Sequence, residues 1–289
     1  MRLATFLDGQ RPRVGAVDGD SIVDLTTAGL GADMTALIEA GPEALARAAE
    51  IVGGGDGRST LAEVEILSPI AQPPKILAVG LNYADHVAET GRDAPIVPMI
   101  FNKQSTSICN PGDPIHVPRA SHMVDWEGEL GVVIGKRCRH VPAEKAAGVI
   151  FGYTIVNDVS VRDWQHRVPT FTMGKSWDTH CPLGPVIVTA DEIGNPHRLE
   201  LKTWVNDDLR QSSNTKHLIF DCYTLVEHLS TAFTLEPGDV ISTGTPSGVG
   251  AAMDPQVWLV NGDTVRIEIQ DIGTLSNPVI DEPEDTPLF

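Results

Sequence analysis

Apolar and polar residues alternate over short segments along most of this chain, which is the pattern of β-strands with one buried face. The first thirty residues contain three such segments, and Asp8-Gly9 and Asp18-Gly19 between them are typical of tight hairpin turns. Further strand candidates follow between residues 72 and 280: KILAVGL, MIFNK, ELGVVIG, FGYTIVND, PVIVTA, LELKTWVND, DVISTGT and DTVRIEIQDIG. The pattern predicts a strand-rich protein of the α+β class.

Helical spacing of apolar residues is confined to a few segments. Met34–Val52 is the longest, and Pro42 within it predicts two short helices joined by a turn, because proline interrupts the hydrogen bonds of a helix. Ala143–Gly148 and Asp221–Phe233 are also predicted to be helical.

Prolines mark the connection between two parts of the chain. Pro69, Pro73 and Pro74 crowd the segment VEILSPIAQPPKI, which predicts an extended connector rather than a helix or a strand. We therefore expect a small N-terminal domain over residues 1–70 and a larger, strand-rich domain over residues 71–289.

Composition acts mainly by excluding classes of function. The chain of 289 residues carries a net charge of −18 at pH 7, and so acidic a surface repels phosphate backbones and anionic lipids. We therefore expect neither nucleic acid nor a membrane as a partner. The longest apolar run, Ile76–Leu81, is far shorter than the roughly 20 residues of a membrane-spanning helix. The four cysteines show no CxxC spacing, which predicts reduced thiols in a cytoplasmic protein.

Three carboxylates stand at positions that favour a metal site. Glu127 and Glu129 are two residues apart at the start of the apolar strand GVVIG, so their side chains point to the same face. Asp158 follows the strand FGYTIV. Carboxylates this close repel one another unless a cation lies between them, and oxygen ligands suit Mg²⁺, Mn²⁺ or Ca²⁺. The alternative is a solvated strand edge that binds nothing.

A histidine and a glutamate form a second candidate group. His86 and Glu89 are three residues apart in NYADHVAETGR, and in a short helix they share a face. A carboxylate that fixes the tautomer of a histidine makes the imidazole a general base for water; the alternative is a surface ion pair. The surrounding segment Asn82–Pro95 is predicted to become ordered over a bound ligand. Lys175, in the turn-like stretch TMGKSWDTHCPLGP, is a further candidate, with a solvated lysine as the alternative.

Five motifs in this order resemble the fumarylacetoacetate hydrolase family: GLNYADHVAE, DWEGELGVVIGK, GYTIVNDVSVRDWQ, GKSWDTHCPLGP and GDVISTGTPSGVG. The resemblance covers roughly residues 70–280. It implies a mixed β-roll catalytic domain preceded by a small N-terminal α/β domain. It also implies a divalent metal, usually Mg²⁺, bound by Glu127, Glu129 and Asp158. These are the carboxylates that the strand spacing already indicates.

By the same resemblance, other positions match the family's site residues. His86 and Glu89 match the dyad on the lid over the substrate, and Lys175 matches the active-site lysine. Three more positions match residues around the substrate: Arg162 and Gln165 near the metal, and Thr245 at the substrate's carboxylate end. Trp177 and His180 depart from the commoner GKSxDTxxPLGP pattern and could reshape the pocket, so the substrate of a relative does not carry over to this chain.

The activity implied by the resemblance is metal-dependent hydrolysis of a carbon–carbon bond in an acylpyruvate or 1,3-diketo acid, similar to fumarylacetoacetate or fumarylpyruvate. His86 would activate water, while the metal and Lys175 would stabilise the departing enolate. The alternatives are an oxaloacetate-type decarboxylase, a 2-hydroxymuconate-type isomerase or decarboxylase, and a catalytically silent metal-binding dimer. A small 2-oxo or diketo acid is the expected partner, and a homodimer is the expected assembly.

Overall fold

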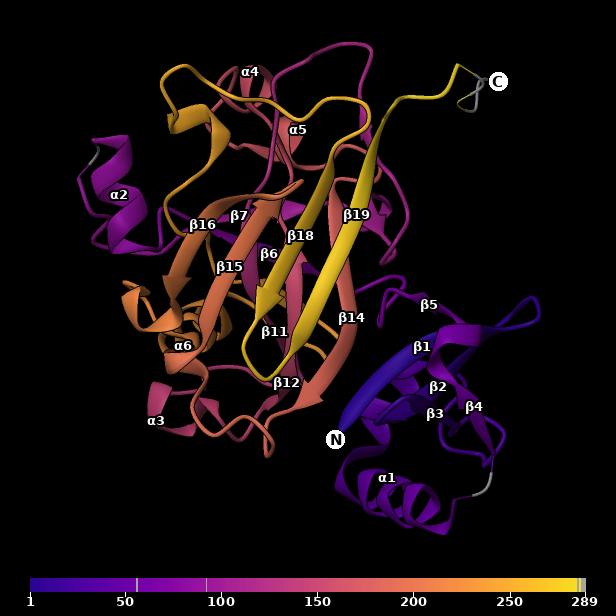
Figure 1. Cartoon of the computed structure of the whole chain (residues 1–289). Coiled ribbons are helices and arrows are strands. Elements are labelled where there is room, and N and C mark those ends of the chain that lie inside the picture. Colours follow the sequence, from indigo (N-terminus) through magenta and orange to yellow (C-terminus); the bar gives the residue numbers. More distant parts are fainter. Residues whose placement is uncertain (56, 92, 285, 287–289) are drawn as a thin grey trace.

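The computed structural model describes residues 1–55, 57–91, 93–284 and 286, so position 92 of the predicted lid segment lies outside the described residues. Figure 1 shows two curved sheets packed against each other, with an N-terminal unit beside them. Among the described helices, none combines the length and the hydropathy that crossing a bilayer requires.

The N-terminal unit is an antiparallel meander covered by a helix. Both predicted hairpins are confirmed: β1 pairs with β2 and β2 pairs with β3. The predicted break in the first helix is also confirmed, because the backbone leaves helical geometry at Gly41 (φ 72°), immediately before Pro42. The elements are β1 (Arg2–Asp8), β2 (Arg11–Asp18), β3 (Ser21–Asp24), α1 (Met34–Gly54), β4 (Arg58–Thr60) and β5 (Glu65–Leu67).

The larger sheet joins this unit to the rest of the molecule. Its path is β4-β3-β2-β1-β14-β12-β11-β17-β6-β7, so β1 hydrogen-bonds to β14 and the N-terminal strands continue the same sheet. A division near residue 70 stays a prediction. The strands from the remainder of the chain are β6 (Ile76–Gly80), β7 (Met99–Lys103), β11 (Gly128–Ile134), β12 (Ile150–Asn157), β14 (Cys181–Thr189) and β17 (Val240–Ser242).

A five-stranded sheet covers the larger one, in the order β16-β15-β18-β19-β9. Its inward side chains, such as Val265 and Ile267, pack in one core cluster with Leu130 and Val132 of β11. Both sheets contain parallel and antiparallel neighbours, which confirms the strand-rich, mixed α+β fold. The strands here are β9 (Ile115–Val117), β15 (Glu200–Val205), β16 (Asp208–Asn214), β18 (Thr264–Ile269) and β19 (Gly273–Asp281); short pairings involve β8 (Ile108–Cys109), β10 (Val124–Asp125) and β13 (Ser160–Val161).

Helices lie at both ends of the packed sheets (Figure 1). α3 (Ala143–Ala146) and α6 (Cys222–Ala232) fall within the predicted helical segments. α2 (Ala84–Thr90) is the predicted short helix, and it ends at Gly91, whose φ of 65° is one that glycine adopts readily. α4 (Arg162–Gln165) and α5 (Thr172–Lys175), at the opposite end from α3 and α6, were not predicted, since four residues are too few to show a helical period. Single 3₁₀ turns occupy Leu61–Glu63, Ser105–Ser107, Pro196–Arg198, Thr215–His217 and Gly250–Ala252.

Candidate active site

The three predicted metal ligands form a buried carboxylate cage. Glu127 directly precedes β11, Glu129 lies within it, and Asp158 directly follows β12. The antiparallel pairing of β11 with β12 brings them together, and the Asp158 amide donates to the Glu127 carbonyl at 2.9 Å. One oxygen of each carboxylate lies within 4.8 Å of the other two. All three residues are at most 6% exposed, which excludes the alternative of a solvated strand edge.

Cationic side chains neutralise part of this negative charge. The Lys175 ammonium is 2.6 Å from Glu127 Oε2 and 2.7 Å from Asp158 Oδ2. Burial alone would raise the pKa of Glu127, but the charges of Lys175 and Arg162 outweigh it and lower that pKa to about 2. Lys175 is itself buried rather than solvated, and the same carboxylates leave its pKa raised despite the burial.

The third carboxylate, Glu129, is held by neutral donors instead. Its carboxylate accepts hydrogen bonds from the Ser242 hydroxyl at 2.5 Å and the Gly244 amide at 2.8 Å. Burial, with the charges of Asp158 and Glu127, raises the pKa of Glu129 well above its ordinary value. Additional positive charge would therefore be stabilised here, and the donor set consists of hard oxygen ligands. The residues present fit a divalent cation of the Mg²⁺, Mn²⁺ or Ca²⁺ type.

Two residues of this network were missed from the sequence. Lys103, at the end of β7, is 3% exposed; its ammonium donates to Asp158 Oδ1 at 2.7 Å and to the Lys175 carbonyl. Asp125 Oδ2 lies 2.7 Å from the Arg162 guanidinium. The available signals were weak: a lysine closing an apolar strand, and an acidic residue next to the ExE pair.

The predicted dyad is formed on α2. His86 Nδ1 is 3.1 Å from Glu89 Oε2, as the spacing of three residues predicts for a helix. The other oxygen of Glu89 accepts a hydrogen bond from the Gly248 amide at 2.8 Å. Because Glu89 is an acceptor, it favours the tautomer with the proton on Nδ1 and leaves the Nε2 lone pair of His86 available. His86 is 8% exposed, so the alternative of a surface ion pair does not describe it.

A cavity of about 310 Å³ is lined by the dyad and by one carboxylate of the cage, Glu127. Its polar wall contains His86, Glu89, Glu127, Arg162, Gln165 and Lys175. Met99, Phe101 and Phe171 provide an apolar wall. The volume falls at the lower end of the range of small-molecule sites, and the combination of fixed charges with an apolar wall suits a small acid that carries a non-polar group.

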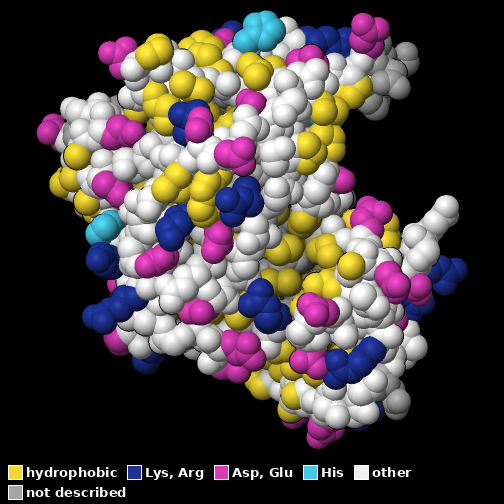
Figure 2. Space-filling view, viewed as in Figure 1, with side chains coloured by type: hydrophobic (Ala, Val, Ile, Leu, Met, Phe, Trp, Pro, Cys, Tyr) yellow, Lys and Arg dark blue, Asp and Glu magenta, His cyan; other side chains and the backbone are white. Residues whose placement is uncertain are grey.

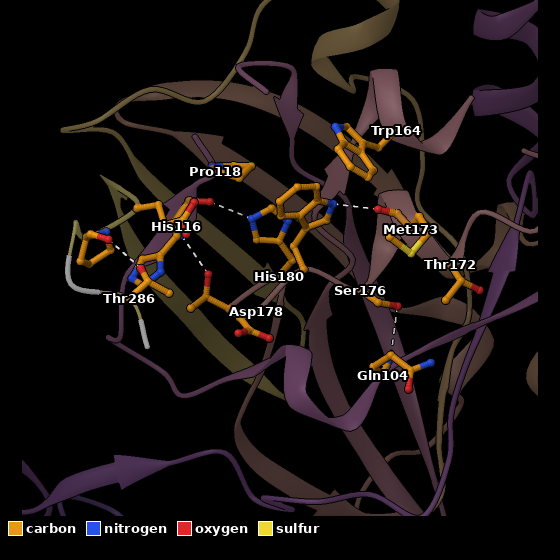
Figure 3. Close-up of a pocket in the computed structure, with 14 residues that line it drawn as sticks. Gln104, His116, Pro118, Trp164, Thr172, Met173, Ser176, Asp178, His180 and Thr286 are labelled. Carbon is orange, nitrogen blue, oxygen red and sulfur yellow. Dashed lines mark hydrogen bonds between the residues drawn. The ribbon is translucent and has the colours of Figure 1, made fainter. Parts of the chain in front are cut away.

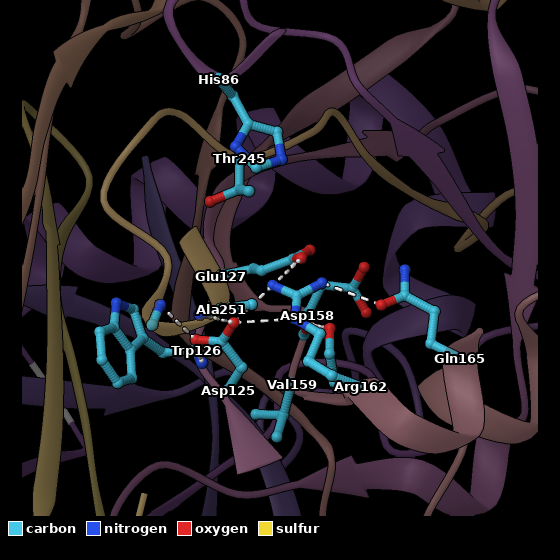
Figure 4. A network of polar contacts seen from close by, with 12 residues as sticks. His86, Asp125, Trp126, Glu127, Asp158, Val159, Arg162, Gln165, Thr245 and Ala251 are labelled. Carbon is cyan, nitrogen blue, oxygen red and sulfur yellow. Dashed lines mark hydrogen bonds and ion pairs between the residues drawn. The ribbon is translucent and has the colours of Figure 1, made fainter. Parts of the chain in front are cut away.

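Arg162 and Thr245 are more constrained than the sequence suggested. Arg162 bridges Asp125 and Glu127, and its NH1 donates to Gln165 Oε1 at 3.0 Å (Figure 4). The Thr245 hydroxyl donates to the Gly128 carbonyl at 3.0 Å and accepts from Gln211 at 2.8 Å. Thr245 is not among the described residues that line the cavity, so its predicted contact with substrate stays a prediction.

Trp177 and His180 lie elsewhere. Both line a second cavity of about 750 Å³ (Figure 3), and neither is among the described residues lining the cavity with the dyad. Their effect on the shape of the substrate pocket stays a prediction, and neither side chain lines the cavity with the dyad. The reason is that α5 directs Lys175 toward the cage, while Met173 and the residues after the helix face the second cavity.

Known proteins resemble this chain in sequence over most of its length. The sequence profile described as fumarylacetoacetate (FAA) hydrolase C-terminal matches residues 75–280. The mitochondrial oxaloacetate tautomerase fahd2 of Xenopus laevis is 42% identical over 288 residues, covering 97% of this chain and 90% of that protein.

Two solved structures extend the likeness to the whole fold. Maleylpyruvate hydrolase from Sphingobium sp. SYK-6, in complex with manganese(II) and pyruvate, has a TM-score of 0.82 and 38% identity, and the match covers 98% of this chain and 100% of that one. A 5-carboxymethyl-2-hydroxymuconate delta-isomerase from Mycobacterium smegmatis gives a TM-score of 0.79 and 39% identity at the same coverage. With the profile match over most of its length, the chain belongs to the fumarylacetoacetate hydrolase family, whose members include hydrolases, isomerases and tautomerases.

Proposed function

We propose that this protein is a metal-dependent hydrolase that cleaves a carbon–carbon bond in an acylpyruvate or a related 1,3-diketo acid. The observation that carries the proposal is the cavity in which the His86–Glu89 dyad faces Glu127 and Lys175. A histidine oriented by a carboxylate is the usual device for activating water, and hydrolysis needs this group.

The metal ligands are Glu127, Glu129 and Asp158, and we propose Mg²⁺ or Mn²⁺ as the ion. The manganese and pyruvate in the Sphingobium hydrolase support this choice. These carboxylates would hold the divalent cation, which would supply Lewis-acid polarisation of a bound 2-oxo acid.

Side chains of the protein would carry out the proton transfers and stabilise the charge that develops. Glu89 holds the proton on Nδ1 of His86, so that Nε2 accepts a proton from water as the water attacks the distal carbonyl. The carbon–carbon bond of the resulting adduct then breaks, which releases the carboxylic acid and leaves the electron pair on the pyruvate fragment. The buried ammonium of Lys175 balances that negative charge and then protonates the carbon to give pyruvate. Met99 and Phe101 contact the acyl group and limit the access of further water.

A second candidate is tautomerisation of oxaloacetate, which the relative from Xenopus laevis favours because the likeness covers nearly the whole chain. Moving a proton between carbon and oxygen needs the same oriented histidine and lysine but no attack by water. The two reactions therefore differ in the distal group and in the fate of the carbon–carbon bond.

The experiment is a substrate panel with purified protein and Mg²⁺ or Mn²⁺. Acylpyruvates of increasing chain length and oxaloacetate are incubated, and products are identified by mass, with ultraviolet absorbance following the enol form. The proposal expects pyruvate and a carboxylic acid from at least one acylpyruvate, and loss of the reaction with a chelator. Enol–keto interconversion of oxaloacetate without any acylpyruvate cleavage would replace the hydrolase with the tautomerase.

A further inference from the structure

The segment that leads into α2 is anchored by hydrogen bonds to a distant part of the chain. The Asn82 side chain is fully buried; it donates to the carbonyls of Phe220 at 2.9 Å and Thr243 at 2.7 Å, and accepts from the Phe220 amide at 2.8 Å. Tyr83 forms an isolated β-bridge with Leu218. The backbone that leads into the helix is therefore fixed before the first helical residue.

Asp85 adds further hydrogen bonds that anchor the first turn of α2. Its Oδ1 accepts the His86 amide at 2.8 Å, and its Oδ2 accepts the Ser213 hydroxyl at 2.7 Å. His217 Nδ1 lies 3.2 Å from the Ser213 hydroxyl and 3.9 Å from Asp85 Oδ2. Asp85 is not among the described residues that line the cavity, so these contacts lie behind the dyad rather than within the site.

The helix depends on such contacts for its position. α2 has 7 residues, and isolated helices shorter than about 12 residues are marginal in water. Its far end is held by the Glu89–Gly248 hydrogen bond. Successive helical residues point about 100° apart, so one turn can direct Asp85 toward β16 while His86 faces the cavity.

We propose that Asp85 is a positioning residue, which through Ser213 and His217 holds the first turn of α2 so that His86 faces the carboxylate cage. The inference rests on the proposed function in one respect, namely that His86 acts as the base. The anchoring of α2 through Asp85 and Ser213 does not depend on which reaction the site performs.

Amide hydrogen exchange tests, without any substrate, whether Ser213 anchors α2 through Asp85. Ser213→Ala removes the hydroxyl that Asp85 accepts, and Ser212→Ala is the matched control, because Ser212 is exposed on the neighbouring position of β16. We expect exchange at residues 86–90 to be about tenfold faster in Ser213→Ala, the equivalent of one lost hydrogen bond. Ser212→Ala should match the wild type. Equal protection in the two variants would overturn the proposal.

Kinetics then test whether the position of His86 is what matters. Ser213→Ala should lower kcat by about tenfold with KM nearly unchanged, and Ser213→Thr, which restores a hydroxyl, should recover most of it. In a His86→Ala background the Ser213→Ala change should have no further effect, because a positioning residue acts only through the group it positions. Equal losses of kcat in both backgrounds would refute the role. If no hydrolysis occurs at all, the proposed function fails. The exchange experiment still shows whether Asp85 and Ser213 anchor α2.

Discussion

At the scale of single residues, the carboxylate cage is a group of buried charges whose neutralisation is incomplete. Lys175 and Arg162 neutralise Glu127, whereas Glu129 lies among negative neighbours and has a raised pKa. Glu129→Gln keeps the shape of the side chain and an oxygen that can accept from Gly244, but removes the charge. We expect Mg²⁺ affinity, measured by titration calorimetry, to fall by roughly tenfold or more, since a ligand charge is lost. Glu268→Gln, on the exposed face of β18, is the control, and equal affinities would contradict the cage as the metal site.

The dyad leads to a prediction about reaction type. A general base contributes about 10²–10⁴-fold to rate, so His86→Ala should lower acylpyruvate hydrolysis by that factor. Mg²⁺ affinity should stay nearly constant because His86 is not a proposed ligand. Glu89→Gln should cost less, since Glu89 only orients the imidazole. Any decarboxylation of oxaloacetate should fall much less, because it needs no activated water; equal losses in both reactions would assign His86 to closing the site instead.

At the scale of elements, two four-residue helices decide where Lys175 lies. α4 and α5 pack so closely that a Cβ added at Gly174 would lie 2.3 Å from the Cα of Gln165. Such a distance forces backbone to move. The position of Lys175 against the cage thus depends on the absence of a side chain at its neighbour.

Gly174→Ala tests this packing. Overpacking typically costs about 1–3 kcal/mol, and the displaced α5 should carry Lys175 away from Glu127, so activity should fall more than stability alone explains. Gly194→Ala is the matched control, because a Cβ there meets nothing within 4 Å. Denaturant unfolding and the rate of pyruvate release are measured for both variants. If the Gly174→Ala protein is as active as Gly194→Ala, the packing of α5 does not determine the position of Lys175.

At the scale of the whole molecule, stability is predicted to depend on a histidine that does not line the cavity with the dyad. His180 is fully buried, and its Nε2 donates to the His116 carbonyl at 2.8 Å. Burial lowers the pKa of His180 to about 3 from an ordinary 6.5. At a pH between these values, His180 binds a proton in the unfolded chain but not in the folded chain. The free energy of unfolding therefore decreases as the pH falls through this window.

His180→Gln keeps a donor for His116 and removes the titration. From pH 7 to pH 5 the wild type should lose about 2 kcal/mol more of its unfolding free energy than this variant, at roughly 1.4 kcal/mol per pH unit below pH 6.5. Urea unfolding at the two pH values measures the difference. His228→Gln, at an exposed position of α6, should follow the wild type. Parallel pH dependence in wild type and His180→Gln would mean that His180 does not titrate as its burial predicts.

The expected homodimer also belongs to this scale and stays a prediction. Light scattering of the purified chain over a range of concentrations measures its mass. Acidic and basic side chains alternate over the face shown in Figure 2, so this face offers no single block of charge that would direct assembly.

Local pattern was enough to predict the features that depend on neighbours in sequence. The hairpins follow from Asp-Gly turns, the paired direction of Glu127 and Glu129 from the period of a strand, and the His86–Glu89 contact from the period of a helix. The tertiary structure alone decided which distant segments meet. Lys103 reaches Asp158 across 55 positions, and Asp85 reaches Ser213 across 128. It also placed Trp177 outside the cavity that contains the dyad. Such contacts depend on the order and packing of the strands, which repeating patterns within a segment do not specify, because the same alternation suits many sheet neighbours.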